Sequence, residues 1–169
     1  MKKLLLACIT TVLVSGCASS GVQLNSPIPP TAKIGVIQFG DCAIPQQDDC
    51  IGSGKKASEE YAKVFETAVI IRPAELSPTD SVPTKIAAAL AKNQGYDYVI
   101  TGLVTERYDV APFTFRVDRA GVNLQVLKTS DVSQSAVQVI PSMNAGSNLA
   151  TPEGLFNDFA KMLKNESIK

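Results

Sequence analysis

The sequence predicts an α/β domain of three layers, with helices on both faces of a mixed five-stranded sheet. Segments typical of strands and helices follow one another in the order βαβαβββα. A strand–helix–strand connection is right-handed in nearly all proteins, so the first three strands should run parallel. The first and third strands are apolar on both faces, which places them centrally in the sheet. We therefore expect the strand order 2-1-3-4-5, with only strand four antiparallel.

The first half of the domain is expected to contain two strands and one helix. β-branched and aromatic residues fill 33–39 (KIGVIQF) and predict a buried strand. After a long loop, apolar residues at helical spacing predict a helix over 57–68, with Ser58 suited to its start. A short second strand is expected at 69–72, and Pro73 ends it because proline cannot donate to a strand ladder.

The second half is expected to contain three strands and two further helices. A helix is predicted over 83–93, and Gly95 is well placed to close it. The most hydrophobic strand covers 97–110, and residues 113–128 form one long strand or two, with Gly121 as a candidate bulge. The last two elements are, in order, a strand at 136–140 and a helix that opens at Thr151.

The amino terminus has the features of a secretory signal. A short positive segment precedes an apolar run at 4–14, and its 11 residues are fewer than the roughly 20 that cross a bilayer. The next residues, Val14-Ser15-Gly16-Cys17, resemble the lipobox of bacterial lipoproteins, in which a branched residue and two small residues precede a cysteine. The resemblance implies cleavage between Gly16 and Cys17 and a diacylglyceryl group on the Cys17 thiol.

Residues 18–32 are small, polar and proline-bearing, which is typical of a flexible tether. Fully extended at about 3.1 Å per residue, they would reach roughly 45 Å from the membrane. The chain then divides into a signal peptide (1–16), the lipidated cysteine with its tether (17–32) and a periplasmic α/β domain (33–169). In lipoproteins the residue after the cysteine directs sorting, and Ala18, where aspartate would favour retention, implies the outer membrane.

The composition argues against several classes of function. The chain has 16 basic and 16 acidic residues, and loss of Lys2 and Lys3 with the signal peptide leaves no positive excess, so no nucleic-acid partner is expected. It has no histidine, which removes the usual general base near neutral pH and the commonest metal ligand. It also has no tryptophan. We therefore expect no enzymatic activity, no cofactor and no bound metal.

Three stretches resemble a known group of envelope domains. Residues 95–102 (GYDYVITG), 33–39 and 117–128, the last followed by Thr-Ser-Asp at 129–131, are similar to an anticodon-binding-like domain. That domain occurs in the curli secretion lipoprotein, in the lipoprotein activators of peptidoglycan synthases and at the amino terminus of TolB; small Gram-negative lipoproteins of this type look closer still. The resemblance covers about 33–164 and implies the fold. This sequence lacks the membrane-inserting hairpins of the curli pore, the propeller of TolB and the long arm of the synthase activators. The resemblance therefore does not imply the specific activities of those proteins.

Cys42 and Cys50 are the thiols that remain once the signal peptide is removed and Cys17 is lipidated. Outside the cytoplasm, such a pair predicts a disulfide, which would contribute about 2.5 kcal/mol on the loop-entropy model. The alternative is a metal site, made by the same two cysteines with Asp48 and Asp49.

Charged residues of both signs crowd the third and fourth strands, at Glu106, Arg107, Asp109, Arg116, Asp118 and Arg119. On adjacent antiparallel strands such residues are typical of exposed ion pairs, each worth less than ~1 kcal/mol. The alternative is a hydrolase with paired carboxylates. Aromatic residues beside the arginines suit a protein interface. The expected docking surface consists of Arg107, Tyr108, Phe113, Arg116 and Arg119.

The anchor, the missing catalytic groups and the resemblance together favour a non-enzymatic accessory lipoprotein. Its domain is expected to dock onto another protein of the cell envelope, while the lipid on Cys17 holds it to the membrane. Two alternatives stay open. One is a periplasmic binder of a small ligand or a metal that uses the Cys42–Cys50 loop, and the other is an enzyme built on aspartate and glutamate alone.

Overall fold

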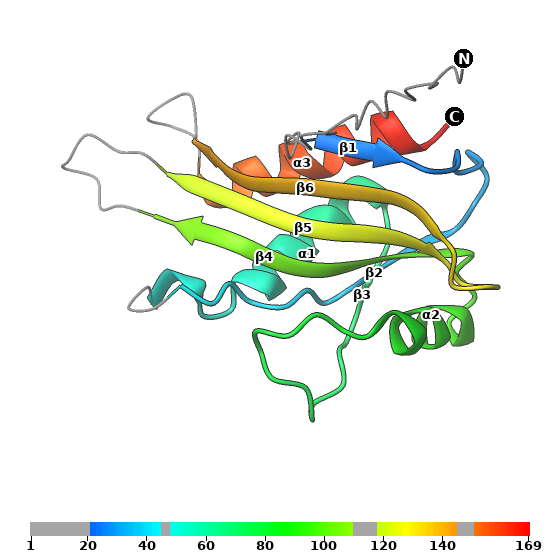
Figure 1. The fold of residues 1–169 in the computed structure, drawn as a ribbon, viewed down its shortest axis with the longest axis horizontal. Helices are drawn as coiled ribbons and strands as arrows, with labels where there is room; N and C mark the ends of the chain where they lie inside the picture. Colours follow the sequence, from blue (N-terminus) through cyan, green and yellow to red (C-terminus); the bar gives the residue numbers. More distant parts are fainter. Residues whose placement is uncertain (1–20, 45–47, 110–117, 145–150) are drawn as a thin grey trace, which may run out of the picture.

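The computed structural model describes residues 21–44, 48–109, 118–144 and 151–169. Within these ranges the chain forms one mixed sheet of six strands and three α-helices (Figure 1). The strands are β1 (Gly21–Leu24), β2 (Ile34–Ile37), β3 (Val69–Ile70), β4 (Tyr98–Tyr108), β5 (Arg119–Lys128) and β6 (Gln134–Asn144). The helices are α1 (Ser53–Phe65), α2 (Thr84–Asn93) and α3 (Pro152–Ser167), with a short 3-10 turn, η1 (Asp48–Cys50).

The sheet has the strand order β1-β6-β5-β4-β2-β3. β2 runs parallel to β3 and β4, whereas β5 is antiparallel to both β4 and β6. The five expected strands therefore lie in the expected order, and only the fourth of them is reversed. The prediction of a five-stranded sheet is wrong, because β1 adds a sixth strand antiparallel to β6.

The sixth strand comes from the segment expected to be a flexible tether. Gly21 to Leu24 pair with β6, and the side chains of Val22 and Leu24 pack against the main core. Ile28, farther along the same segment, is 1% exposed and forms an isolated bridge with Ile168. A four-residue strand followed by Asn-Ser-Pro gives almost no periodic signal, so its pairing depends on β6 and α3. Residues 21–32 therefore belong to the folded domain.

Helices cover both faces of the sheet, as the three-layer prediction requires. α1 and α3 pack on one face, where the main core includes Val36 and Ile100 from the strands. α2 packs on the other face, where a smaller core includes the neighbouring residues Ile37 and Val99. Successive side chains of a strand point to opposite faces, so each central strand contributes to both cores. This arrangement explains why these two strands carry apolar residues on both faces.

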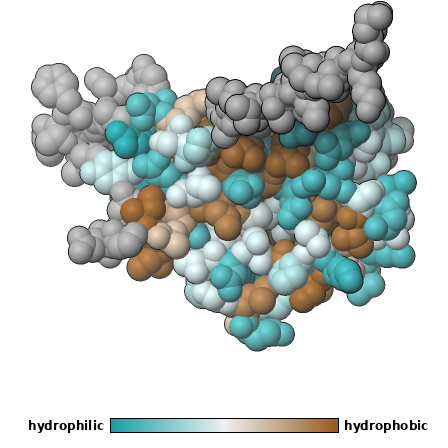
Figure 2. Space-filling view, viewed as in Figure 1, coloured by the Kyte–Doolittle hydropathy of each residue, from teal (hydrophilic) through white to brown (hydrophobic). Residues whose placement is uncertain are grey.

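α2 covers only part of the second face. Leu103 of β4 and Val137 and Val139 of β6 are partly exposed and belong to neither core. The space-filling view shows hydrophobic side chains among polar ones over the middle of the sheet (Figure 2). We call Leu103, Val137 and Val139 the open sheet face.

The ends of the helices follow local capping rules, with one correction. Thr151 accepts a hydrogen bond from Gly154 N at 3.1 Å and so caps α3, and Gly95, with φ of 80°, closes α2 as expected. The predicted start of the first helix is wrong. Ser58 lies buried inside α1, where its hydroxyl accepts from Phe39 N and donates to Gly54 O. The register of β5 shifts against both neighbours at Gly121, the candidate bulge position, but the extra residue lies on β4 and on β6 and not on β5.

Candidate docking site

The predicted disulfide between Cys42 and Cys50 is present. Both residues are buried, with Cα atoms 5.0 Å apart, and they close the loop between β2 and α1. Because the two sulfurs are bonded to each other, neither is a free thiolate, which the alternative metal site requires. Among the residues that the structure describes, no group of three potential metal-ligating side chains occurs.

Asp41 fixes the disulfide loop to the start of α1. Its carboxylate accepts hydrogen bonds from the backbone N–H groups of Gly52 and Gly54, at 2.9 and 2.7 Å. The N-cap residue of α1 is Gly52, which has no side chain to satisfy the first N–H groups, and Asp41 does this from outside the helix. Ser53 Oγ accepts from Cys42 N at 3.0 Å and adds a second link.

Arg72 holds a second loop against the end of β2. Its guanidinium donates to four backbone carbonyl oxygens, those of Phe39, Ser77, Pro78 and Asp80, at 2.6 to 3.3 Å. At Gly40 the two loops touch: a Cβ atom there would lie 2.6 Å from Asp80 O. The loops after β2 and β3 therefore form one packed unit at the carboxyl ends of these parallel strands.

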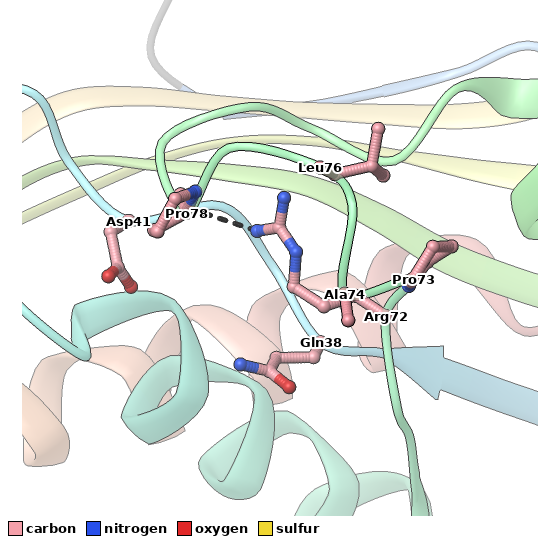
Figure 3. A pocket seen from close by; sticks show the side chains of 7 residues that line it. All are labelled: Gln38, Asp41, Arg72, Pro73, Ala74, Leu76 and Pro78. Carbon is pink, nitrogen blue, oxygen red and sulfur yellow. Dashed lines mark hydrogen bonds between the residues drawn. The ribbon is translucent and has the colours of Figure 1, made fainter.

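Two adjoining cavities lie on this unit. The first, of about 200 Å³, is lined by Gln38, Asp41 and Arg72 together with the other residues labelled in Figure 3, where the Arg72 side chain lies at its centre. The second, of about 300 Å³, lies beside the disulfide and shares Asp41 and Pro78 with the first. Small-molecule sites usually enclose about 300–1,000 Å³, so both are small for a ligand.

Two exposed isoleucines belong to these loops, and one of them lines a cavity. Ile51 lines the second cavity and is 78% exposed, and Ile71, the neighbour of Arg72, is 73% exposed. We call the residues lining the second cavity, together with Ile71, the disulfide-loop surface. Isolated exposed hydrophobic residues are common, but one on each of two loops that are packed against each other is suited to protein contact.

Arg107, expected on the docking surface, is instead buried. Its side chain is 6% exposed, and Nε and Nη2 donate to Glu153 Oε1 at 3.3 and 2.8 Å. Nη1 donates to Asp49 O at 3.1 Å, so one guanidinium links β4, η1 and the first turn of α3. Because its donors are used inside the domain, Arg107 is not an accessible member of the predicted docking surface.

The other expected docking residues are placed differently. Tyr108 is 37% exposed at the end of β4. The side chain of Arg119 is 48% exposed and forms a cross-strand ion pair with Glu106, at 3.8 Å, as the ion-pair interpretation predicted. Phe113 and Arg116 lie outside the described residues. The structure thus leaves Tyr108 and Arg119 as accessible members of the predicted surface.

The network around Arg107 alters the ionisation of Glu153. Partial burial raises the pKa of Glu153. Hydrogen bonds from Arg107 and from the Glu153 backbone, together with the positive charges of Arg107 and Lys56, outweigh this effect, so the net pKa lies below the usual value. A carboxyl group whose pKa is lower in the folded chain than in the unfolded chain stabilises the fold. This stabilisation is fully present at pH values above the unfolded-state pKa, and it is lost as the pH falls through the folded-state pKa.

We therefore predict that Glu153→Gln destabilises the domain at neutral pH and that the difference from wild type shrinks as the pH falls below about 4. Urea unfolding across a pH series measures it. The matched control compares glutamate and glutamine at position 153 in an Arg107→Met background. The pH-dependent part of the difference should become smaller there, because the backbone of Glu153 and Lys56 still lower the pKa while Arg107 no longer does. A difference between the two chains that is constant with pH would contradict the prediction.

Removal of the disulfide is expected to lower the free energy of unfolding by about 2.5 kcal/mol, because the loop then regains its freedom in the unfolded chain. The Cys42→Ser/Cys50→Ser variant, compared with oxidised wild type by urea unfolding, gives this difference. Reduced wild type is the control and should match the double variant. Equal stability of all three proteins would show that Asp41 and Ser53 hold the loop without the bond.

The anchor lies outside the described residues. This applies to the lipobox at 14–17, to Cys17 and to the Gly16–Cys17 bond, so lipidation and cleavage stay predictions. In the ranges that the structure describes, no helix combines the length and the apolar character needed to cross a membrane.

The sequence did not point to several residues that build the site. Asp41 precedes a cysteine and Arg72 precedes a proline, and neither position belongs to a periodic pattern. The groups that Arg72 binds are backbone carbonyls, which any sequence possesses, so no residue pattern predicts its role. The capping of α1 by Asp41 had a weak signal in the sequence, because an acidic residue lies before the disulfide loop and a Gly-Ser-Gly run lies after it.

Comparison with known proteins shows similarity at the level of the fold. No family model matches the sequence, and no curated protein matches it. The solved dodecamer of PelC from Paraburkholderia phytofirmans is similar, with a TM-score of 0.56 and 17% identity over 88% of this chain and 97% of that chain. A second structure, of a PelC variant from the same organism, has the same TM-score and identity, and the match covers 98% of that chain.

A lipoprotein of Neisseria meningitidis, GNA1162, is also similar, with a TM-score of 0.42 and 17% identity over 80% of this chain and 95% of that chain. The PelC comparison shows that the α/β architecture described above occurs in another bacterial protein of similar length. At 17% identity it shows the fold and no more.

Proposed function

We propose that this chain is a lipid-anchored protein of the bacterial envelope whose non-enzymatic domain docks onto another envelope protein. The observation that carries the proposal is the disulfide-loop surface, where Ile51 is exposed at the cavity beside the disulfide and Ile71 is exposed next to Arg72 of the adjoining cavity. An exposed apolar group on a loop with little freedom loses little entropy on binding, which favours association.

The sequence features support the same compartment. The Lys-Lys start, the short apolar run and the Val-Ser-Gly-Cys segment resemble a lipoprotein signal, and two or more acyl chains give stable anchoring. Disulfides persist in oxidising compartments such as the periplasm, so the Cys42–Cys50 bond agrees with export. The resemblance to anticodon-binding-like envelope domains agrees with a domain in the periplasm. Ala18, at the sorting position after the lipidated cysteine, favours the outer membrane.

Photo-crosslinking in intact cells tests the docking proposal. A crosslinking amino acid at Ile51 should capture a discrete protein, and the same amino acid at Lys92, an exposed polar position of α2, should not. An Ile71→Asp substitution in the Ile51-labelled protein should weaken the capture, because it places a charge in the apolar contact. Equal capture from both positions, or none from Ile51 at native abundance, would reject the disulfide-loop surface as the contact.

A second candidate is assembly with copies of the same chain. The open sheet face (Leu103, Val137 and Val139) offers partly exposed apolar side chains, and the PelC structures that share the fold are dodecamers. Native mass spectrometry of the full protein released from detergent tests this candidate. A multimer that Val139→Lys dissociates would support it, and a monomer would leave docking to a different protein as the function.

A further inference from the structure

We infer that the domain lies directly on the lipid headgroups, with the β1 edge of the sheet toward the membrane and the β3 edge away from it. This inference rests on the proposed lipid anchor at Cys17 and adds the orientation of the domain. The inference follows from two observations: β1 begins close to Cys17 in the sequence, and β1 is an edge strand of the sheet.

The link between anchor and fold is short. β1 begins at Gly21, so only four residue steps separate it from Cys17. An extended chain spans at most about 3.3–3.6 Å per residue, so Gly21 lies within roughly 14 Å of the lipidated cysteine. A domain of this length has a radius of gyration of about 15 Å and therefore a diameter well above that reach. The domain is consequently too large to turn its β1 edge away from the membrane.

β1 is firmly attached to the domain, so the link does not lengthen without loss of structure. All four of its residues pair with β6. The backbone N–H groups of Asn25 and Ser26 both donate to Ser135 O, at 2.8 and 3.0 Å. Ile28 is 1% exposed, and its N–H donates to Ser167 O at 2.9 Å. Peeling β1 away would break these hydrogen bonds and expose Val22 and Leu24.

The strand order then fixes what faces the periplasm. β1 and β3 are the two edges of the sheet, and five strand intervals of about 4.8 Å place them roughly 24 Å apart. Figure 1 shows β1 and α3 along one side of the molecule and β2, β3 and α2 along the other. Ile71, which follows β3, therefore lies on the side away from the membrane, where a periplasmic partner can reach the disulfide-loop surface.

The chemistry of the β1 side fits headgroups and not the hydrocarbon interior. Gln23 of β1 and Asp158, Lys161 and Asn165 of α3 are exposed and polar. In the described part of the chain, the large exposed hydrophobic residues are Ile51, Ile71, Ile86, Tyr108 and Met143, none of which belongs to β1 or α3. The β1 edge therefore rests on the headgroup layer, and the acyl chains at Cys17 alone enter the bilayer.

Tryptophan quenching tests the orientation, because the chain has no tryptophan of its own. The full lipidated protein is prepared as the single variants Gln23→Trp and Ile71→Trp and inserted into phosphatidylethanolamine–phosphatidylglycerol vesicles that carry a nitroxide on the headgroup. The Gln23→Trp protein should lose more than half of its fluorescence relative to vesicles without nitroxide. The Ile71→Trp protein should lose almost none.

A lengthened tether is the control. Insertion of about 20 Gly/Ser residues after Ser20 adds a random-coil reach of roughly 25 Å, which should abolish the quenching of Gln23→Trp while the protein stays bound to the vesicles. Equal quenching of the two tryptophans at native tether length would overturn the orientation and leave the anchor intact. Purified protein that carries no fatty acid would overturn the anchor as well, and its mass distinguishes the two failures.

Discussion

Gly54→Ala is expected to destabilise the domain by about 3 kcal/mol, at the upper end of the usual cost of overpacking. Gly54 lies in the first turn of α1, where the helix approaches the end of β2. A Cβ atom there would lie 2.2 Å from Phe39 O and 2.8 Å from Gly40 C. Both obstacles are backbone atoms, and Asp41 and the disulfide hold that backbone in place, so neither can move cheaply.

Urea unfolding of Gly54→Ala and of the matched variant Gly154→Ala measures the effect. Gly154 also lies in the first turn of a helix, but its added Cβ would meet only Thr151 Oγ1, at 3.6 Å. Alanine is the better helix former by about 1 kcal/mol, so this variant should be as stable as wild type or more so. Equal stability of the two variants would contradict the close packing of α1 on β2.

Arg107→Met is expected to cost about 2–3 kcal/mol, because hydrogen bonds to charged groups are worth about 1.5–3 kcal/mol and several are lost together. Methionine fills similar volume but leaves Glu153 and Asp49 without their common partner. Both carboxylates are about one-third exposed, at 30% and 35%, so water solvates them in part and the cost stays below that of a fully buried broken pair.

Arg119→Met is the control for this prediction, because it removes a guanidinium group from the neighbouring strand β5. The Arg119 side chain is 48% exposed, and its pairing with Glu106 at 3.8 Å is a surface ion pair. Such pairs contribute about 0–1 kcal/mol, so thermal unfolding of this variant should resemble that of wild type. If the two arginine variants unfolded at the same temperature, Arg107 would have no special role in joining β4, η1 and α3.

The periodic elements were predictable because their signals are local. The two central strands carry apolar residues on both faces, and α2 and α3 carry apolar residues at helical spacing with Gly95 and Thr151 at their ends. The disulfide was predictable from the predicted export and from the number of cysteines. Each of these features is decided by residues that lie close together in the sequence.

The features that the sequence did not predict depend on distant partners. β1 gains its hydrogen bonds from a strand more than a hundred residues later, so its own four residues give no strand signal. Arg107 resembled a surface residue because its strand is rich in charges, and its burial depends on Glu153 at the start of α3. Ser58 resembled a helix start, but Asp41 supplies the cap from outside the helix.

The mass of the mature protein isolated from cell membranes tests the central claim most directly. A lipid-anchored chain should begin at Cys17 and carry the additional mass of a diacylglyceryl group, with or without an amide-linked acyl chain. A Cys17→Ser variant should lack that mass and leave the membrane fraction. A protein that begins at Met1 and carries no fatty acid would contradict the anchor, and with it the compartment and the orientation inferred from it.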